Sequence, residues 1–287
     1  MSDEIIHLNG RLLPASEACV SIADHGFLYA DGLFETVRSY DGRPFRLNRH
    51  LERLFSSAKL IALTLPLTKE QFTAVVLETM AANDLLDARI RITVTRSAGK
   101  PGMLLDPQQP PTILITAHPL ALPSAEKYAQ GWTAAVVSER RNSQSLLSSI
   151  KTLNYLPGRV ATMQARVAGA EEPILLNERG LATEGASSNL FLVMKGELVT
   201  PDLQSGILPG ITRAVVLEIA SRLGLQAVER QVLPDDLRQA DEVFLTSSVV
   251  EFRPIVSIDG HAVGAGMPGP VTQSVMAGYR EETAQVR

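Results

Sequence analysis

A lysine, a carboxylate, a glycine-threonine turn before a helix and a late pair of serines stand along this chain where they could hold a single cofactor. Lys151 lies in the leucine-rich stretch 146–156, and Glu184 lies in a run of small residues. The turn is at residues 210–212, and the serine pair is in the segment 246–248. A lysine amine can form a Schiff base, a carboxylate can keep a pyridine nitrogen protonated, and helix-start amides with hydroxyls can bind a phosphate. The set therefore predicts a pyridoxal 5′-phosphate site, with chemistry at the α-carbon of an amine.

Lys151 is one of six lysines and, taken alone, would be expected to lie in solvent as most lysines do. Its apolar neighbours Leu147, Ile150 and Leu153 indicate instead that the amine is partly desolvated, which favours the neutral, nucleophilic form. Tyr155 follows four residues later and could reach the phenolic oxygen of the cofactor from the same side of a turn.

The other candidate residues also have ordinary alternatives. Glu184 could be an exposed turn residue or the partner of the cofactor's ring nitrogen. The turn at 210–212 precedes a helical pattern, so it could be a simple cap or could present its amides to a phosphate. Arg53, on the polar side of an earlier predicted helix, is either a surface charge or a phosphate ligand. Ser247 and Ser248 form the late hydroxyl pair that would complete a phosphate site.

Charge and cysteine content restrict the classes of function. The chain has 287 residues, a net charge of −4 and one cysteine, Cys19. The acidic balance argues against nucleic acid and anionic membranes as partners, and a single cysteine excludes an internal disulfide. The acidic N-terminus lacks a signal-peptide pattern, and no apolar stretch approaches the roughly 18 residues of a membrane span. We expect a cytoplasmic protein.

Periodicity predicts a mixture of helices and strands. Helices are expected over residues 48–61, 68–83, 210–223 and 270–282. Strands are expected near residues 89–96, 113–116, 133–138, 173–176, 190–194 and 242–246, with hairpin turns at 9–10, 41–42, 195–196 and 259–260. Strands arrive in clusters joined by turns, which favours an α/β (mixed α+β) fold with mixed or antiparallel sheets and flanking helices.

A stretch with two prolines, residues 118–124, separates two such blocks. The sequence therefore predicts a smaller N-terminal α/β domain over residues 1–118, a linker over 119–128 and a larger cofactor-binding domain over 129–287.

Taken together, the motifs resemble one known family. They are DGLFE at 31–35, HLERL at 50–54, Lys151, EGASSNLF at 184–191, LPGITR at 208–213 and ADEVF at 240–244. This order is similar to that of the class IV aminotransferases, the fold type IV pyridoxal phosphate enzymes, over nearly the whole chain. The group includes branched-chain aminotransferases, D-amino acid aminotransferases and 4-amino-4-deoxychorismate lyases.

The resemblance implies a role for each matching residue. Lys151 would form the Schiff base and move the proton, Tyr155 would contact the phenolic oxygen, and Glu184 would contact the pyridine nitrogen. The phosphate would be held by Arg53, the amides of Ile211 and Thr212, and Ser248. The resemblance further implies two α/β domains with the cofactor between them, and a homodimer in which a loop near Tyr29 reaches the partner's site.

On the substrate side, Tyr29, Phe34 and Arg38 match the branched-chain aminotransferases. The Tyr-x-Arg motif of those enzymes is matched in part, since Arg91 stands in the place of the arginine and Arg89 in that of the tyrosine. The arginines are candidates for a substrate carboxylate because a planar guanidinium binds it through two parallel bonds. Each arginine could equally be a strand residue that faces solvent.

Three rivals stand beside a branched-chain-like transaminase. The usual D-amino acid enzymes place an Arg-x-His pair shortly after that strand, and residues 99–103 lack it. The lyases often share the Phe34-x-x-x-Arg38 pattern and the Lys-x-Leu-Asn pattern of residues 151–154. A non-catalytic phosphate-binding relative needs neither a lysine nor a ring-nitrogen partner. We predict transamination between an aliphatic amino acid and a 2-oxo acid such as 2-oxoglutarate, with pyridoxal 5′-phosphate and no metal.

Overall fold

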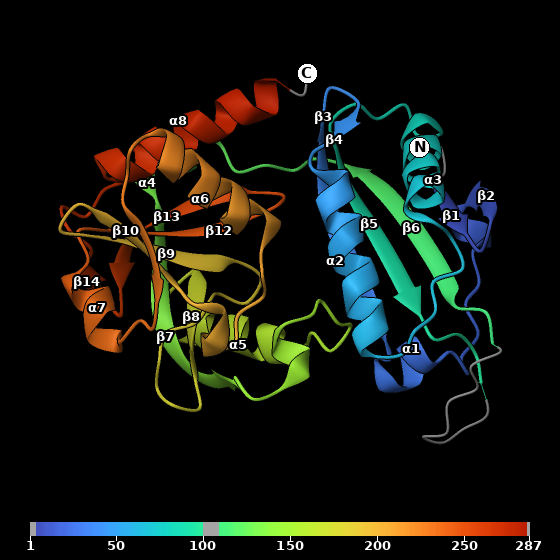
Figure 1. The fold of residues 1–287 in the computed structure, drawn as a ribbon, viewed down its shortest axis with the longest axis horizontal. Coiled ribbons are helices and arrows are strands. Elements are labelled where there is room, and N and C mark those ends of the chain that lie inside the picture. Colours follow the sequence, from blue (N-terminus) through green and yellow to red (C-terminus); the bar gives the residue numbers. More distant parts are fainter. Residues whose placement is uncertain (1–3, 100–108, 286–287) are drawn as a thin grey trace. The chain divides into compact units, whose positions relative to one another are not determined.

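The computed structural model describes residues 4–99 and 109–285. The acidic first three residues, and residues 100–103 of the stretch compared with the D-amino acid enzymes, lie outside them. Two compact units can be distinguished (Figure 1). The first comprises Met1–Ala121, Ile150–Asn154 and Thr283–Arg287, and the second comprises Leu122–Ser149 and Tyr155–Glu282. Lys151 therefore belongs to the first unit, although both flanks of its five-residue segment belong to the second.

The first unit is built on a six-stranded antiparallel sheet with the strand order β2-β1-β6-β5-β3-β4. The strands are β1 (Ile5–Leu8), β2 (Arg11–Pro14), β3 (Gly32–Tyr40), β4 (Arg43–Pro44), β5 (Ala88–Thr95) and β6 (Thr112–Pro119). Asn9 and Gly10 connect β1 to β2 with positive φ at both positions, as an Asn-Gly turn predicts, because a type I′ turn needs the left-handed region twice.

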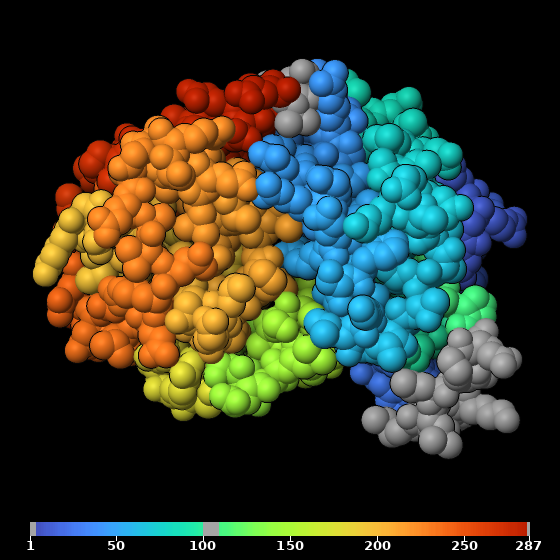
Figure 2. Space-filling view, viewed as in Figure 1, coloured from blue at the N-terminus to red at the C-terminus, as the bar shows by residue number. Residues whose placement is uncertain are grey.

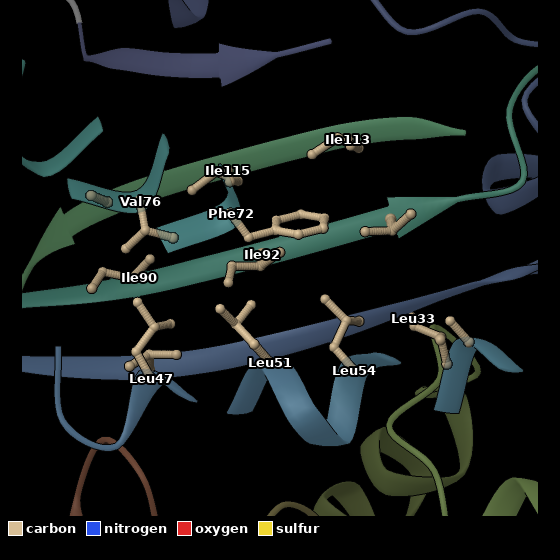
Figure 3. Close-up of a cluster of buried hydrophobic side chains, with 14 of the residues drawn as sticks. Leu33, Leu47, Leu51, Leu54, Phe72, Val76, Ile90, Ile92, Ile113 and Ile115 are labelled. Atoms are coloured by element: carbon tan, nitrogen blue, oxygen red, sulfur yellow. The ribbon is translucent and has the colours of Figure 1, made fainter. Parts of the chain in front are cut away.

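Two helices cover one face of this sheet. They are α2 (Leu47–Leu60) and α3 (Lys69–Ala81), close to their predicted ranges, and Thr68 caps α3 through reciprocal bonds with Gln71. Their side chains hide most of β5 and β6 in the space-filling view (Figure 2). The core between helices and sheet is apolar and includes Leu33, Leu47, Leu51, Leu54, Phe72, Val76, Ile90, Ile92, Ile113 and Ile115 (Figure 3).

The opposite face of the same sheet carries the polar and aromatic side chains of two strands. Side chains alternate along a strand, so Leu33 and Ile90, which face the helices, fix the direction of their neighbours. Phe34 and Arg38 of β3, and Arg91 of β5, consequently point away from the helices.

A short helix, α1 (His25–Tyr29), precedes β3 and was not expected from the sequence. Asp24 caps it by accepting from the amide of Gly26 at 2.7 Å. The other oxygen of Asp24 accepts from the hydroxyls of Thr95 and Thr112, each at 2.8 Å. This buried aspartate thus anchors the start of α1 to β5 and β6.

The second unit contains an eight-stranded mixed sheet with the order β11-β10-β9-β12-β13-β7-β8, in which β14 pairs with β13. The strands are β7 (Trp132–Arg141), β8 (Glu172–Asn177), β9 (Asn189–Met194), β10 (Glu197–Pro201), β11 (Ala227–Arg230), β12 (Glu242–Ser247), β13 (Glu251–Ile258) and β14 (His261–Ala262). The helices are α4 (Ala125–Gln130), α5 (Leu156–Val167), α6 (Ile211–Arg222), α7 (Pro234–Gln239) and α8 (Pro270–Ala284), and single 3₁₀ turns occupy Leu146–Ser148 and Leu203–Ser205. A further 3₁₀ turn, Ala15–Glu17, belongs to the first unit.

The predicted fold class is confirmed: one sheet is antiparallel, the other is mixed, and helices flank both. Several local elements differ from the expectations, α1 and α7 among them. Helix α4 lies largely inside the predicted linker, and α5 was not predicted because Pro157 and Gly158 stand near its start. Proline is tolerated there because the first amides of a helix have no intrahelical acceptor. Among the described residues, no helix is long and apolar enough to cross a membrane.

The segment that carries Lys151 pairs with the beginning of β3. The amide of Phe34 donates to the carbonyl oxygen of Lys151 at 3.0 Å, and the amide of Leu153 donates to that of Gly32 at 3.0 Å. A Cβ atom at Gly32 would lie 2.5 Å from the carbonyl oxygen of Val94 and 2.7 Å from Cδ1 of Leu153. Glycine at position 32 therefore permits the close packing of β3 against β5 and against the side chain of Leu153.

We predict that Gly32→Ala loosens the packing on both sides of β3, because the new Cβ would collide with the rigid backbone of β5 at Val94 and with the side chain of Leu153. Hydrogen exchange at the amides of Phe34 and Leu153 should accelerate, and the free energy of unfolding should fall by about 1–3 kcal/mol. Gly10→Ala is the control, since no atom lies within 4 Å of its Cβ position and only a positive φ is strained. Unchanged protection of both amides in Gly32→Ala would contradict this description of the pairing.

Candidate active site

The amine of Lys151 lies over an aromatic ring. Its Nζ is 4.5 Å from the ring centroid of Phe34, and the guanidinium carbon of Arg91 is 3.8 Å from the same centroid. Phe34 is only 4% exposed, and Lys151 and Arg91 are half-buried. The structure thus brings together three residues that the sequence singled out at separate places in the chain.

Two further arginines stand on the same sheet face. Arg38 and Arg89 are directly opposite each other on β3 and β5, and the guanidinium of Arg38 lies 4.4 Å from the ring centroid of Tyr40. Like charges opposite each other on adjacent strands destabilise a sheet, and a bound anion would relieve that cost. The face is therefore suited to a carboxylate, which is the ligand that the sequence proposed for these arginines.

A buried ion cluster occupies the helix-covered face of β3. Arg53 donates from Nε and Nη2 to the two carboxylate oxygens of Glu35, each at 2.7 Å, and Nδ1 of His50 lies 2.7 Å from Oε2. The ionised carboxylate can only accept, so His50 donates from Nδ1. The side chain of Arg53 is 10% exposed, which overturns the alternative of a surface charge.

Burial alone would raise the pKa of Glu35. The charge and hydrogen bonds of Arg53, together with the bond from His50, outweigh that effect and lower the pKa to about 2. The pKa of His50 is lowered chiefly by burial, so its ring is neutral at pH 7. The sequence did not identify Glu35 or His50 as site residues. A signal was present for His50, which stands three positions before Arg53 on one helix, the spacing that places side chains on a common face.

In the second unit, Glu184 is 6% exposed, which overturns the alternative of an exposed turn glutamate. Nη2 of Arg141 is 2.8 Å from Oε1 of the carboxylate. Oε2 accepts from the amide of Leu208 at 3.1 Å and from Nδ2 of Asn189 at 3.3 Å. Three donors from separate segments thus hold the carboxylate, and the cation among them favours its ionised form.

Arg141 and Asn189 were not identified from the sequence, and each connects Glu184 to another part of the unit. Arg141 also donates to the carbonyl oxygens of Ser148, at 2.7 Å, and Gly206, at 3.2 Å. Nδ2 of Asn189 also donates to the carbonyl oxygen of Leu208 at 2.9 Å. The only sequence signal was the place of Asn189 five residues after Glu184, at the start of a predicted strand.

The predicted phosphate turn does open a helix. Helix α6 begins at Ile211, and its N-cap is Gly210, which is in an extended conformation and supplies no side-chain cap. A Cβ atom at Gly210 would lie 1.8 Å from Oδ1 of Asn189, so glycine there allows the amide of Asn189 to lie against the helix start. Thr212 is buried in the first turn.

The remaining candidates occupy less constrained positions. Tyr155 is the half-buried N-cap residue of α5. Ser247 is the last residue of β12, and Ser248 is the next residue in the chain. Tyr29 ends α1, is 42% exposed, and makes an edge contact with the ring of His25 at 5.2 Å between centroids.

The depressed pKa of Glu35 predicts a pH-dependent stability. A carboxyl group with a pKa near 2 in the folded state and 4.5 otherwise stabilises the fold fully above pH 4.5 and loses that effect as the pH falls toward 2. Glu35→Gln should therefore lower the free energy of unfolding by roughly 3 kcal/mol at pH 7 and by clearly less at pH 3. Urea unfolding at both values measures this difference. Asp235→Asn, in an exposed pair with Arg238, should matter little at either pH. An equal effect of Glu35→Gln at both pH values would refute the assignment.

Comparison with known proteins places the chain in a family. The family model for amino-transferase class IV matches residues 32–258. A Methanocaldococcus jannaschii protein named "Putative branched-chain-amino-acid aminotransferase" is 41% identical over 279 residues, which cover 96% of this chain and 95% of that protein. A D-alanine aminotransferase of Bacillus licheniformis is 35% identical over 271 residues, 93% of each chain.

Solved structures agree with this match. The T.th. branched-chain amino acid aminotransferase with pyridoxamine 5′-phosphate superposes with a TM-score of 0.94 at 31% identity, over 100% of this chain and 96% of that chain. The same enzyme complexed with N-(5′-phosphopyridoxyl)-L-glutamate gives a TM-score of 0.93 at 30% identity, with the same coverage. The chain therefore belongs to the class IV aminotransferases, the family of pyridoxal 5′-phosphate enzymes that its motifs indicated.

Proposed function

We propose that this aminotransferase moves an amino group between an aliphatic, branched-chain-like amino acid and a 2-oxo acid such as 2-oxoglutarate. The observation that carries the proposal is the sheet face of the first unit, where the amine of Lys151 shares the ring of Phe34 with Arg91. A proton-carrying amine next to a carboxylate-binding guanidinium is what a reaction at the α-carbon of an amino acid requires.

The residues present fit pyridoxal 5′-phosphate, which supplies an electron sink for negative charge at the substrate's α-carbon when it is bound. We propose that Nζ of Lys151 binds the cofactor's aldehyde carbon and, once released by the incoming amine, carries the α-proton. Tyr155 would donate from its hydroxyl to the phenolic oxygen. The phosphate would be bound by Arg53, the amides of Ile211 and Thr212, and the hydroxyls of Ser247 and Ser248.

Glu184 would accept a hydrogen bond from the protonated ring nitrogen. Arg141, Asn189 and the amide of Leu208 already donate to this carboxylate and stabilise its negative charge. A carboxylate that is stabilised in this way binds a proton poorly, so the shared proton would stay on the ring nitrogen, where it increases the electron demand of the ring.

The proposal of an aliphatic substrate is supported by the side chains near Lys151 and by the similar enzymes. Phe34 and Tyr29 supply apolar surface, whereas Arg38, Arg89 and Arg91 supply charge for the carboxylates of both substrates. The glutamate adduct in the T.th. enzyme supports glutamate and its oxo acid as the second pair. An apolar pocket distinguishes one methylene by only about 1–3 kcal/mol, so several aliphatic amino acids should react at graded rates.

The D-alanine aminotransferase of Bacillus licheniformis, at 35% identity, favours a D-amino acid transaminase as the second candidate. Residues 99–103 lack the Arg-x-His pair that marks the usual D-amino acid enzymes, so we rank this activity below the branched-chain one. The Lys-x-Leu-Asn pattern at 151–154 keeps a lyase acting on aminodeoxychorismate as a third.

We predict that the pyridoxal phosphate-loaded protein is converted to its aminated, differently absorbing form by L-leucine. D-alanine and aminodeoxychorismate should be tested separately in the same spectrophotometer. Conversion by D-alanine alone would identify the D-amino acid enzyme, and turnover of aminodeoxychorismate without conversion would identify the lyase; either result would overturn the proposal. Lys151→Ala is the control that must abolish conversion, because it removes the amine that moves the proton.

We also propose that the protein is a homodimer in which the segment near Tyr29 reaches the partner's site. Five large apolar residues gather in this short stretch, each between 42% and 81% exposed: Val20, Ile22, Phe27, Leu28 and Tyr29. Several large apolar side chains that are exposed along one short segment are typical of an interaction site.

The lone cysteine suits a reducing compartment, and we place the enzyme in the cytoplasm. Co-fractionation with an extracytoplasmic marker would contradict that location.

The dimer predicts a mass in solution of about twice the 31.0 kDa of one chain, measurable by sedimentation equilibrium. Ile22→Asp combined with Phe27→Asp should reduce it to that of one chain, because an interface cannot bury unpaired carboxylates without cost. Leu203→Asp, at another exposed leucine, should leave the dimer intact. A wild-type protein with the mass of one chain at every concentration would sink the proposal.

A further inference from the structure

We propose that Phe34 is a positioning residue whose aromatic ring holds both the free amine of Lys151 and the guanidinium of Arg91 for the transamination reaction. The inference deepens the proposed function and rests on it. In this proposal the ring does more than line an apolar pocket. The ring keeps the proton-carrying amine and a carboxylate-binding guanidinium at fixed positions relative to each other.

The ring is itself held firmly. Phe34 lies opposite Thr93 in the β3–β5 register, and its amide donates to the carbonyl oxygen of Lys151 at 3.0 Å. Only 4% of the residue is exposed. The backbone is thus paired on both edges of β3 at this position, and the side chain has little freedom to move away from the groups that it contacts.

Both cations reach the ring from neighbouring backbone positions. Arg91 pairs with Thr36, two residues along β3 from Phe34, so Arg91 and Phe34 are diagonal neighbours on one face. Nε of Arg91 also donates to the hydroxyl of Thr93 at 3.1 Å, which orients the guanidinium beside the ring. Lys151 reaches the ring from the segment paired to the start of β3.

The chemistry of the ring explains why an aromatic residue is needed. The face of a phenylalanine carries partial negative charge and attracts ammonium and guanidinium groups, more strongly where water is excluded. Lys151 and Arg91 repel each other, and a lysine amine on four methylene groups would otherwise sample many rotamers. An aliphatic side chain of similar volume could fill the space but could attract neither cation.

The test is a series of fluorinated phenylalanines at position 34, which weakens the negative ring face stepwise while the shape changes little. In the apoprotein labelled with ¹³Cε-lysine, the Lys151 εCH₂ protons should resonate upfield of the other five lysines because of the ring current, and Lys151→Ala identifies them. We expect this upfield shift to shrink with each added fluorine as the amine leaves the ring. In the loaded enzyme, KM for 2-oxoglutarate should rise and kcat should fall in step, by about tenfold from phenylalanine to the trifluoro analogue.

The same series at Phe55, whose ring centroid is 6.0 Å from Nζ of Lys69 in the same unit, is the matched control and should change neither readout. A constant Lys151 resonance across the series would overturn the proposal whatever the enzyme's activity. The proposal would also fail if kcat and KM stayed constant across the fluorinated series while Phe34→Leu impaired them, since the ring would then only fill space. If the protein failed to transaminate but the resonance moved stepwise, the proposed function would be wrong and the ring contact would stand.

Discussion

The pairing of residues 151–153 with the start of β3 decides where the groups of the first unit stand relative to Lys151. Two backbone hydrogen bonds of 3.0 Å make this attachment, and Cδ1 of Leu153 lies 2.7 Å from where a Cβ atom at Gly32 would stand. A strand has two faces, and both are used here. One face presents Glu35 to His50 and Arg53 beneath the helices, and the other presents Phe34 to the lysine amine.

Charge burial imposes a second constraint, and the two units meet it in the same way. A carboxylate can be withdrawn from water only if cations or donors replace its hydration. Glu35 obtains these from an arginine and a histidine on one helix, and Glu184 obtains them from Arg141, Asn189 and a backbone amide. Each carboxylate is therefore fixed in position, and the groups bound to it are fixed as well. Asn189 also contacts the turn before α6, because its side-chain amide donates to the carbonyl oxygen of Leu208 and lies against Gly210.

Features set by local sequence were predicted well. Helices α2, α3 and α6 and strand β5 follow from periodicity and caps, and the two kinds of sheet follow from the clustering of strands. Family motifs identified the residues, but not the interactions that hold them. The partners of Glu35 are 15 and 18 residues away, and those of Glu184 come from three segments, so no spacing rule connects them. The return of residues 150–154 to the first unit is equally non-local, and five residues are too few to carry a pattern.

The most direct test of the central claim, that Lys151 is the residue to which the cofactor binds, is borohydride reduction of the protein loaded with pyridoxal 5′-phosphate, followed by peptide mass spectrometry. Reduction converts the bond between an amine and an aldehyde into a stable one, so the modified lysine can be identified among the six in the chain. We expect the added mass on the peptide that contains Lys151, and on no other lysine at comparable yield. Modification of a different lysine, or equal labelling of Lys151→Ala, would contradict this account.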